Sequence, residues 1–433
     1  MLIEFRVENF LSFEESAALS MIASADTTHE DNCIAIANDK LRVLKSAAIY
    51  GANSAGKSNL IKAMSFMRYL VTYGSKLSKK DILPDFTFKL DKKDESKPSF
   101  FEVVFLKNDK RYRYGFEIGE NKVISEWLFH TPTTREATLF TRDLEDGIVI
   151  GQSFKEAKGL ETKPKNNQLF LNIVAGYNNE QSISEEVIDW FRYFDVTVGP
   201  TMARMFIGKT LHLLDHHGET YQQKMLSFLK KLDVLDDFEI KHTGRVEEFP
   251  DDMPEEVRAY LKSDEDEPVI YIKRKIYKDG KPVGIQEFDL LDDESEGTQK
   301  LFTLAGFFLD TLEHGGTLVV DELESSLHPL ITRKIIEIFN SAIDNPNGAQ
   351  LIFATHDTNL LSNRFFRRDQ IWFVEKSRHG SSCLFSLAEY KDSDERKTRK
   401  DASFGKDYIL GKYGAIPFLG NFDDLLGLEA KNN

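Results

Sequence analysis

Cysteine is scarce in this sequence, and long apolar runs are missing from it. The two cysteines among 433 residues, Cys33 and Cys383, lie far apart and form no pairing pattern, which is typical of a protein from a reducing compartment. No apolar run approaches the roughly 20 residues that a membrane-spanning helix needs. Residues 1–6 alternate like a strand and lack the charged-then-apolar order of a signal peptide. We therefore expect a cytoplasmic protein with no membrane contact.

Positive charge is also in short supply, because 56 Lys and Arg face 71 Asp and Glu and leave a formal net charge of -15. This balance argues against a protein coated in nucleic acid, although it does not exclude a local basic groove. Internal repeats, low-complexity linkers and sustained heptads are absent from the sequence, so neither a repeat architecture nor a long coiled-coil arm is expected. With 41% hydrophobic residues, the chain can bury a large core and divide into two or three lobes.

The first part of the chain combines strands, a glycine-rich loop and a helix. The apolar run 47–50 precedes the loop, and the helix after it carries apolar residues on one face. From residue 86 to about 129 the pattern changes to period two, which predicts an antiparallel sheet. Within the stretch 111–114 (RYRY) the tyrosines fall on one face and the arginines on the other. A sheet core with a solvated edge is therefore favoured there over stacking on nucleic acid.

The second part of the chain is expected to begin with residues 182–264, mostly helical and acidic, with 247–267 as a solvated, carboxylate-rich stretch. A strand pattern returns at Tyr271, and helices alternate with short apolar strands after Asp292. Such strands between amphipathic helices are what a buried parallel sheet needs. We therefore predict an α/β fold of P-loop type, with a mostly parallel sheet core, an antiparallel β-subdomain and a helical insertion. The expected segments are 1–175, 176–268 and 269–433.

The loop after residues 47–50 carries the pattern G-x-x-x-x-G-K-[ST]. Its glycines let the backbone curl so that successive N–H groups face a phosphate chain, and the next helix adds the positive end of its dipole. Lys57 is expected to reach the β- and γ-phosphates of ATP, and the Ser58 hydroxyl to ligate Mg²⁺. A glycine turn before a helix would share this composition, but the flanking strand and helix favour the nucleotide site. The residues predicted to bind the nucleotide here are Gly51, Asn53, Ser54, Ala55, Gly56, Lys57, Ser58 and Asn59.

A second cluster follows the apolar run 317–320, which ends in the paired acids Asp321 and Glu322. A buried strand gains nothing from two adjacent carboxylates unless another charge offsets theirs, and Mg-ATP would do so. On this interpretation Asp321 holds the metal and Glu322 polarises the attacking water as general base. A strand that simply reaches solvent would also end in acids, but the phosphate loop in the same chain favours the catalytic interpretation.

These motifs and three further segments, in this order along the chain, resemble the ABC-type ATPases that include the SMC, RecF and OLD-like proteins. Residues 294–300 (ESEGTQK) open a helix as the signature motif of that superfamily does, although they depart from the transporter form L-S-G-G-Q. Residues 324–329 (ESSLHP) fall where the D-loop is placed, and the apolar strand before His356 resembles the switch-histidine strand. The opening 5–13 (FRVENFLSF) resembles the first strand of SMC and RecF proteins.

The resemblance implies a dimer that closes around ATP. The signature helix of one chain would bring Ser295, Gly297 and backbone N–H groups to the γ-phosphate held by the phosphate loop of the other. His356 would contact the same phosphate. The implied catalytic residues are thus Glu322, His356 and Lys57, the implied metal ligands are Ser58 and Asp321, and the implied cofactors are ATP and Mg²⁺.

The ending 411–417 (GKYGAIP) resembles a closing motif of stand-alone bacterial ATPases of the RloA, PtuA and AriA type, which are often found in anti-phage defence operons. This resemblance implies an ATPase that oligomerises around ATP and controls a separately encoded effector protein, for which a nuclease is the expected activity. The alternative is a DNA-repair or DNA-maintenance ATPase of RecF or SMC type, which would need a basic groove. A third, non-enzymatic alternative is a scaffold in which ATP is structural.

Four weaker features favour structural interpretations. Gln168 is a candidate for a glutamine loop, but a polar residue in a strand fits its neighbours better. His212 and His216 would share a helix face as a metal pair, yet no third ligand motif lies nearby. Residues 395–400 form a basic run typical of a solvated loop. The D-x-D pattern at 392–394 lies in a charged stretch too short for a further domain, so no nuclease is expected within this chain.

Overall fold

The computed structural model describes residues 1–36, 41–76, 78, 81–90, 97–132, 135–177, 181–199, 202–242, 268–391, 398–399 and 402–417. The acidic stretch 247–267 and the D-x-D pattern at 392–394 lie outside the described residues, as does most of the basic run 395–400. Over the ranges given above, no helix combines the length and apolar character that crossing a membrane requires.

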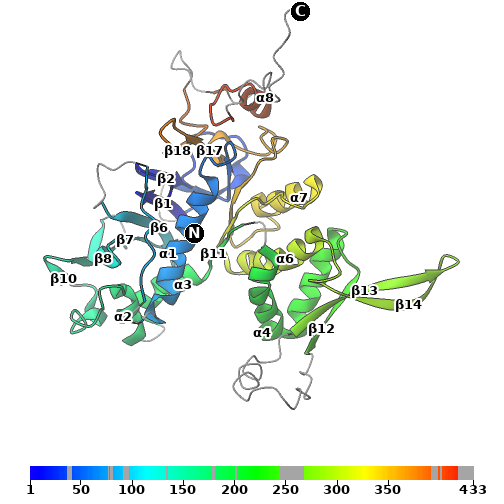
Figure 1. Cartoon of the computed structure of the whole chain (residues 1–433), viewed down its shortest axis with the longest axis horizontal. Helices are drawn as coiled ribbons and strands as arrows, with labels where there is room; N and C mark the ends of the chain where they lie inside the picture. The colour runs from blue at the N-terminus through cyan, green and yellow to red at the C-terminus, as the bar shows by residue number, and fades with distance from the viewer. Residues whose placement is uncertain are drawn as a thin grey trace, which may run out of the picture.

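The centre of the molecule is a six-stranded, mostly parallel sheet (Figure 1). Its strands are β5 (Ser46–Tyr50), β11 (Phe194–Thr197), β15 (Thr317–Val320), β16 (Gln350–Ala354), β17 (Ile371–Lys376) and β18 (Ser382–Ser386). They follow the order β11-β15-β16-β5-β17-β18, and only β18 runs antiparallel to its neighbour. Every residue of β5, β11, β15 and β16 is buried. The predicted parallel core is confirmed.

The second sheet is antiparallel and has seven strands. They are β1 (Leu2–Glu8), β2 (Ala17–Ser20), β6 (Ser99–Lys107), β7 (Lys110–Gly119), β8 (Lys122–Thr131), β9 (Ala137–Asp143) and β10 (Gly147–Ile150), in the order β10-β9-β8-β7-β6-β1-β2. Tyr112 and Tyr114 are fully buried, while Arg111 and Arg113 lie half-buried on the other face, as predicted. The run of antiparallel strands predicted to start near residue 86 starts at Ser99, with β6.

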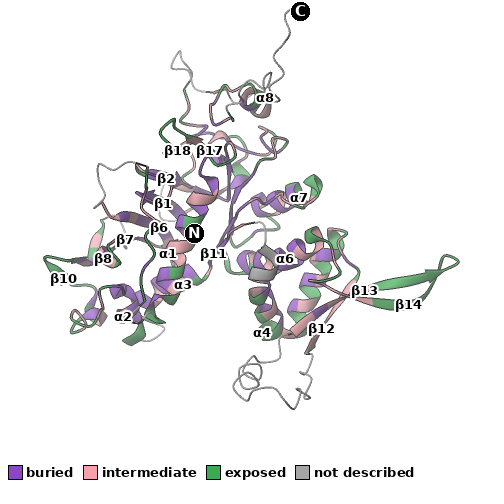
Figure 2. Cartoon of the chain, viewed as in Figure 1, coloured by how far each residue is buried: buried purple, intermediate pink, exposed green. Residues whose placement is uncertain are grey.

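Helices cover both faces of the parallel sheet (Figure 1). The helices among the described residues are α1 (Lys57–Tyr73), α2 (Phe170–Tyr177), α3 (Ile183–Arg192), α4 (Met202–Lys231), α6 (Glu296–His314), α7 (Pro329–Asn340) and α8 (Phe404–Ile409). Ala47 and Ile49 of β5 pack into one hydrophobic core with α1, α2, α3 and the antiparallel sheet. Ala48 and Tyr50 point to the other face and pack with α4, α6 and α7. Successive side chains of β5 therefore point to opposite faces of the sheet and pack into two different hydrophobic cores. The buried residues of both cores are purple in Figure 2.

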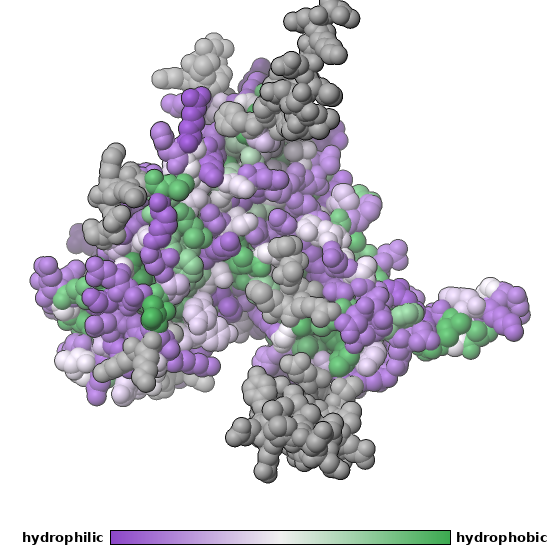
Figure 3. All heavy atoms as spheres, in the orientation of Figure 1, coloured by the Kyte–Doolittle hydropathy of each residue, from purple (hydrophilic) through white to green (hydrophobic). Residues whose placement is uncertain are grey.

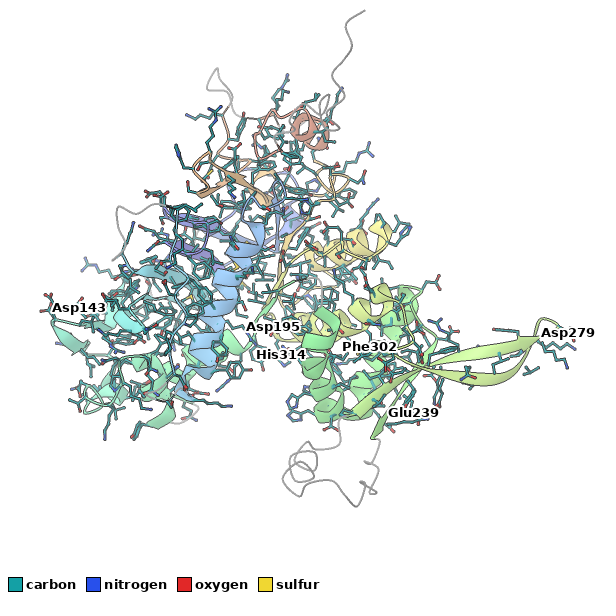
Figure 4. The ribbon with its side chains drawn as sticks, in the orientation of Figure 1. Asp143, Asp195, Glu239, Asp279, Phe302 and His314 are labelled. Atoms are coloured by element: carbon teal, nitrogen blue, oxygen red, sulfur yellow. The ribbon has the colours of Figure 1, made fainter. Side chains whose placement is uncertain are left out.

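The segment 176–268, expected to be helical, also contributes a strand to the central sheet. β11 pairs in parallel with β15, the strand that leads to the acid pair. Its one charged residue, Asp195, is buried and forms ion pairs with Arg68 of α1 and Lys209 of α4 (Figure 4). The segment was expected to be mostly helical, and the strand β11 within it was not predicted, because these two cations allow a carboxylate inside a buried strand. The division of the chain into three segments stays a prediction.

A third sheet forms an arm at one side of the molecule (Figure 1). It consists of β12 (Asp237–His242), β13 (Pro268–Lys278) and β14 (Lys281–Asp289), with β13 in the middle. Past Asp237, where β12 begins, the paired strands β13 and β14 extend outward and are exposed up to Asp279 at the tip (Figures 2 and 4). Ile276 and Ile285 stay 42% and 63% exposed on this arm, where Figure 3 shows apolar surface.

The remaining elements are short. They are the strands β3 (Cys33–Ala35) and β4 (Arg42–Leu44) and the 3-10 turns η1 (Glu30–Asn32), η2 (Gly74–Lys76), η3 (Lys155–Ala157) and η4 (Arg368–Gln370). The stretch after Gln168, expected to be a strand, is instead the helix α2. The N–H groups of Phe170 and Leu171 at its first turn are bound by the buried carboxylate of Glu126. A carboxylate at a helix N-terminus stabilises the helix, and its origin in the distant β8 explains why the local pattern misled.

Candidate functional site

The phosphate loop lies between β5 and α1, and two of its glycines occupy positions where no side chain fits. A Cβ on Gly51 would lie 2.4 Å from the main-chain oxygen of Val374, and one on Gly56 would lie 2.4 Å from Oγ of Ser382. Gly56 also has a φ of 119°, which L side chains rarely adopt. These two glycines therefore specify the path of the loop, and α1 begins directly after it at Lys57.

Two serines outside the predicted site support the back of this loop. The Ser382 hydroxyl donates to the main-chain oxygen of Ala55 at 2.6 Å and lies 2.8 Å from Oγ of Ser12. Asn59 donates from Nδ2 to the same Ser12 oxygen at 2.8 Å. Ser12 belongs to the opening segment that resembles SMC and RecF proteins, so its position carried a signal. Ser382 lies on the edge strand β18, and nothing in the sequence marks it.

The side chain of Lys57 turns back into its own loop. Its Nζ donates to the main-chain oxygens of Gly51 at 2.9 Å and Ala52 at 3.2 Å. Burial lowers the pKa of Lys57, while the nearby carboxylates Asp321, Glu324 and Glu322 act in the opposite direction. Asn53 and Ser54 are exposed at the outer turn of the loop. The ammonium is thus positioned inside the curve of the loop, where a phosphate oxygen could replace the carbonyls.

Asp321 meets Ser58 at the carboxyl end of the parallel sheet. Asp321 follows β15 directly and is only 4% exposed, and the Ser58 side chain lies beside its carboxylate, where it acts to lower the pKa. Its Oδ1 is buried without a hydrogen-bond partner among the described residues. Burial is the main cause that raises the pKa of Asp321. A hydroxyl beside an unsatisfied carboxylate oxygen is a hard-oxygen pair, which fits Mg²⁺ bound with phosphate oxygens and water.

Glu324 adds a third carboxylate to the acid pair. The sequence pattern had placed this residue only in the D-loop. Glu322 is half-buried and has a φ of 51°, a left-handed conformation. Glu324 accepts a hydrogen bond at Oε1 from the main-chain N–H of His356, at 2.5 Å, while its Oε2 is buried without a partner in the described chain. Burial, and next the Lys57 ammonium, lower the pKa of His356. The neutral imidazole is therefore favoured at the end of β16.

The predicted signature residues lie at the start of α6. Ser295 caps this helix, and its Oγ accepts a hydrogen bond from the N–H of Thr298 at 3.3 Å. A Cβ on Gly297 would lie 2.5 Å from the main-chain oxygen of Ser326, so glycine permits the close approach of helix and D-loop. Gly297 therefore lies against the D-loop of its own chain, whereas Ser295 forms its hydrogen bonds within the start of α6. The structure brings together Lys57, Ser58 and the residues after β15 and β16, and it places Gly297 against the D-loop that follows β15.

The weaker candidates lie elsewhere. The main-chain oxygen of Gln168 accepts a hydrogen bond from Arg142 at 2.6 Å beside α2, which is a structural contact in the antiparallel lobe. The rings of His212 and His216 lie 5.8 Å apart on α4. Among the described residues, no group of three or more His, Cys, Asp or Glu could hold a metal ion.

A phosphate loop after one parallel strand, an acid pair after another and a capped helix packed on the loop that follows the acid pair define a P-loop nucleotide-binding fold. Residues 46–362 match the family described as "AAA domain, putative AbiEii toxin, Type IV TA system". This match spans most of the chain, and the protein belongs to that family. It includes the phosphate loop, the signature helix, the acid pair and His356 in one stretch.

Curated proteins and solved structures give two further comparisons. No curated protein matches the chain. Among solved structures, the chain is similar to the one titled "Crystal structure of the SmcHead bound to the C-winged helix domain of ScpA", with 15% sequence identity and a TM-score of 0.41. That similarity covers 89% of this chain and 97% of the other.

Proposed function

We propose that this chain binds Mg-ATP at the phosphate loop and hydrolyses it within a homodimer that closes around the nucleotide. The observation that carries the proposal is the environment of Asp321. One carboxylate oxygen is buried without a hydrogen-bond partner in the part of the chain that the structure describes, and the Ser58 hydroxyl lies beside the same carboxylate. An unpaired buried carboxylate oxygen costs free energy unless a cation meets it. Mg²⁺ bound through one or two protein oxygens and the phosphates of ATP meets that requirement.

Different residues of one chain bind the phosphates of ATP, hold the metal ion and act on the attacking water. The N–H groups of residues 53–58 and the positive end of α1 bind the phosphates, and Lys57 exchanges its two loop carbonyls for phosphate oxygens. Ser58 and Asp321 would hold Mg²⁺, which would offset the charge on the phosphates. Glu322 accepts the proton of the attacking water, and neutral His356 donates a hydrogen bond to the γ-phosphate.

The second chain supplies the signature helix. Ser295 is exposed at the N-terminus of α6, and its Oγ forms hydrogen bonds with Thr298 of the same helix start. In a head-to-tail pair of chains, Ser295 and Gly297 would meet the γ-phosphate bound by the partner. The positive end of the α6 dipole favours that contact. This arrangement gives a second chain a chemical task at each ATP site, which supports a homodimer.

We further propose that ATP binding in the cytoplasm controls a separately encoded effector protein in defence against phage, with a nuclease as the expected effector. The family description names a toxin and a type IV toxin–antitoxin system, which supports action together with another protein. The resemblance of residues 411–417 to defence ATPases points the same way.

Two experiments test these proposals. Turnover of Mg-ATP by the purified chain tests the enzymatic part, and its absence would leave the scaffold alternative. Native mass analysis of tagged protein purified from its own operon tests the effector. An assembly with a neighbouring gene product supports control of an effector. A bare dimer whose turnover is stimulated by duplex DNA would instead support a repair ATPase of RecF type.

A further inference from the structure

Lys300 is a buried cation on α6, close to the signature residues. Lys300 is only 6% exposed to solvent. The ammonium donates to two main-chain oxygens, that of Glu322 at 2.7 Å and that of Ser325 at 2.9 Å. Burial of an ammonium is unfavourable, and burial lowers the pKa of Lys300 to about 8. An apolar residue would fill this position at a lower cost in free energy. The presence of a lysine that binds these two carbonyls therefore needs a physical explanation.

Both carbonyls belong to the turn that carries the proposed general base. The turn begins with Glu322 at a φ of 51° and includes Ser326 at a φ of 59°. The Glu322 oxygen also accepts the N–H of Ser325 at 3.1 Å, and Lys300 adds a charged donor to the same oxygen. Left-handed conformations of residues other than glycine persist when their surroundings hold them. Lys300 therefore helps fix the main-chain conformation from which the Glu322 side chain projects.

The same turn contacts the start of α6 at two further points. Oγ of Ser326 donates to Oε2 of Glu296 at 3.2 Å. Gly297 lies so close to the Ser326 main chain that an added Cβ would be 2.5 Å from its oxygen. Because of these contacts and Lys300, the signature helix start and the Glu322 turn form one packed unit. A displacement of the helix start cannot leave the turn unchanged.

In the proposed dimer this unit connects two ATP molecules. Glu322 acts on the ATP held by its own phosphate loop, whereas Ser295 contacts the ATP held by the partner. We propose that Lys300 is a positioning residue that couples the two sites: contact of α6 with the partner's ATP sets the main chain of Glu322 through the Lys300 ammonium. Hydrolysis at one site then depends on occupancy of the other. This inference rests on the proposed ATP-bound dimer.

The test compares the full-length wild type with Lys300→Met, which removes the donor, and Lys300→Arg, which keeps charge and donors. Lys224→Met, at a cation exposed on α4, is the matched control. Binding of a fluorescent ATP analogue, dimer formation with Mg-ATP, kcat and the Hill coefficient for ATP are measured for each. We expect Lys300→Met to bind ATP and dimerise like wild type but to lose about 10²-fold in kcat, as misplacement of a reacting group does. Its Hill coefficient should fall to about 1, and Lys300→Arg should recover much of both losses.

A folded Lys300→Met variant with wild-type kcat and Hill coefficient would overturn the inference. Equal losses in Lys300→Arg and Lys300→Met, together with weakened ATP binding, would also overturn it, since they indicate a merely structural role. If Lys300→Met does not fold, Lys300→Gln takes its place, and its kcat and Hill coefficient are read in the same way. Failure of the proposed function is distinguishable, because wild type itself would then show no turnover or no ATP-dependent dimer.

Discussion

The main-chain N–H of His356 donates to Oε1 of Glu324 across 2.5 Å, and this hydrogen bond joins the end of β16 to the loop that follows β15. Leu323, next to Glu324, donates its N–H to the main-chain oxygen of Ala354 at 3.2 Å, so the two strand ends are connected twice. These two hydrogen bonds therefore fix the position of the predicted switch histidine relative to the loop that carries the acid pair. A change at the γ-phosphate that moves His356 would reach Glu324 directly.

We predict that Glu324→Gln lowers turnover about tenfold while ATP binding stays close to wild type. The amide keeps an acceptor for His356 but weakens a charge-assisted hydrogen bond of about 1.5–3 kcal/mol. Steady-state kinetics and nucleotide titration measure the two effects. Glu337→Gln, at an exposed acid on α7, serves as control. Wild-type turnover in Glu324→Gln would show that this contact plays no part in catalysis.

Lys57→Ala should lose nucleotide binding as well as turnover. Loss of a charged hydrogen-bond donor to phosphate costs about 1.5–3 kcal/mol, which is about tenfold to hundredfold in affinity. Isothermal titration with ATP measures the change, and Lys224→Ala is the control. An intact affinity in the folded variant would contradict the role assigned to the phosphate loop.

The dependence of turnover on Mg²⁺ should change when Asp321 is replaced. We expect chelation of Mg²⁺ to abolish turnover of the wild type, and Asp321→Asn to raise the Mg²⁺ concentration needed for half-maximal turnover by about tenfold or more, because an amide oxygen is a weaker ligand for a hard cation. Asp344→Asn changes an exposed acid and should leave the Mg²⁺ curve in place. An unshifted curve for Asp321→Asn would remove Asp321 from the metal site.

A structural prediction concerns Glu126, whose carboxylate is fully buried and accepts hydrogen bonds from Tyr114 and from the first turn of α2. Burial is the main cause that raises the pKa of Glu126 above its ordinary value of 4.5. The folded state then binds more protons than the unfolded state above that value, so stability from this group is present at low pH and is lost as pH rises through the folded pKa.

Glu126→Gln removes this titration. The free energy of unfolding of wild type minus that of Glu126→Gln should therefore fall between pH 4.5 and neutral pH. Chemical denaturation at several pH values measures this difference, and Glu145→Gln, at an exposed acid, should show no such trend. A difference that rises with pH would mean that the folded carboxylate is stabilised in its charged form.

The strands, helices and loops that carry local signals were predictable from the sequence. The phosphate loop follows the apolar run 47–50 of a fully buried strand, and its glycines, Lys57 and Ser58 match one continuous motif. The acid pair also lies within its own strand and turn, and Ser295 caps α6 with a local hydrogen bond. In each case the physical cause of the structure lies within a few residues, so a linear pattern can reveal it.

The features that were missed depend on contacts between distant segments. β11 was hidden because Asp195 interrupts its apolar pattern, and the ion pairs that permit Asp195 come from α1 and α4. Ser382 reaches the phosphate loop from more than 300 residues along the chain. Lys300 appears in the sequence as an ordinary helix lysine, and only the folded backbone shows that its ammonium binds the turn of Glu322. Such pairs leave no periodic signal.

The central claim, ATP hydrolysis between two chains with Glu322 as base, is tested most directly by native mass spectrometry of Glu322→Gln with Mg-ATP, alongside its turnover. The account predicts that the variant loses about 10²–10⁴-fold in turnover, the usual contribution of a general base. It also predicts that the variant accumulates as a dimer containing two ATP molecules, because nucleotide is bound but not hydrolysed. A variant that hydrolyses ATP like wild type, or that binds ATP only as a monomer, would contradict the account.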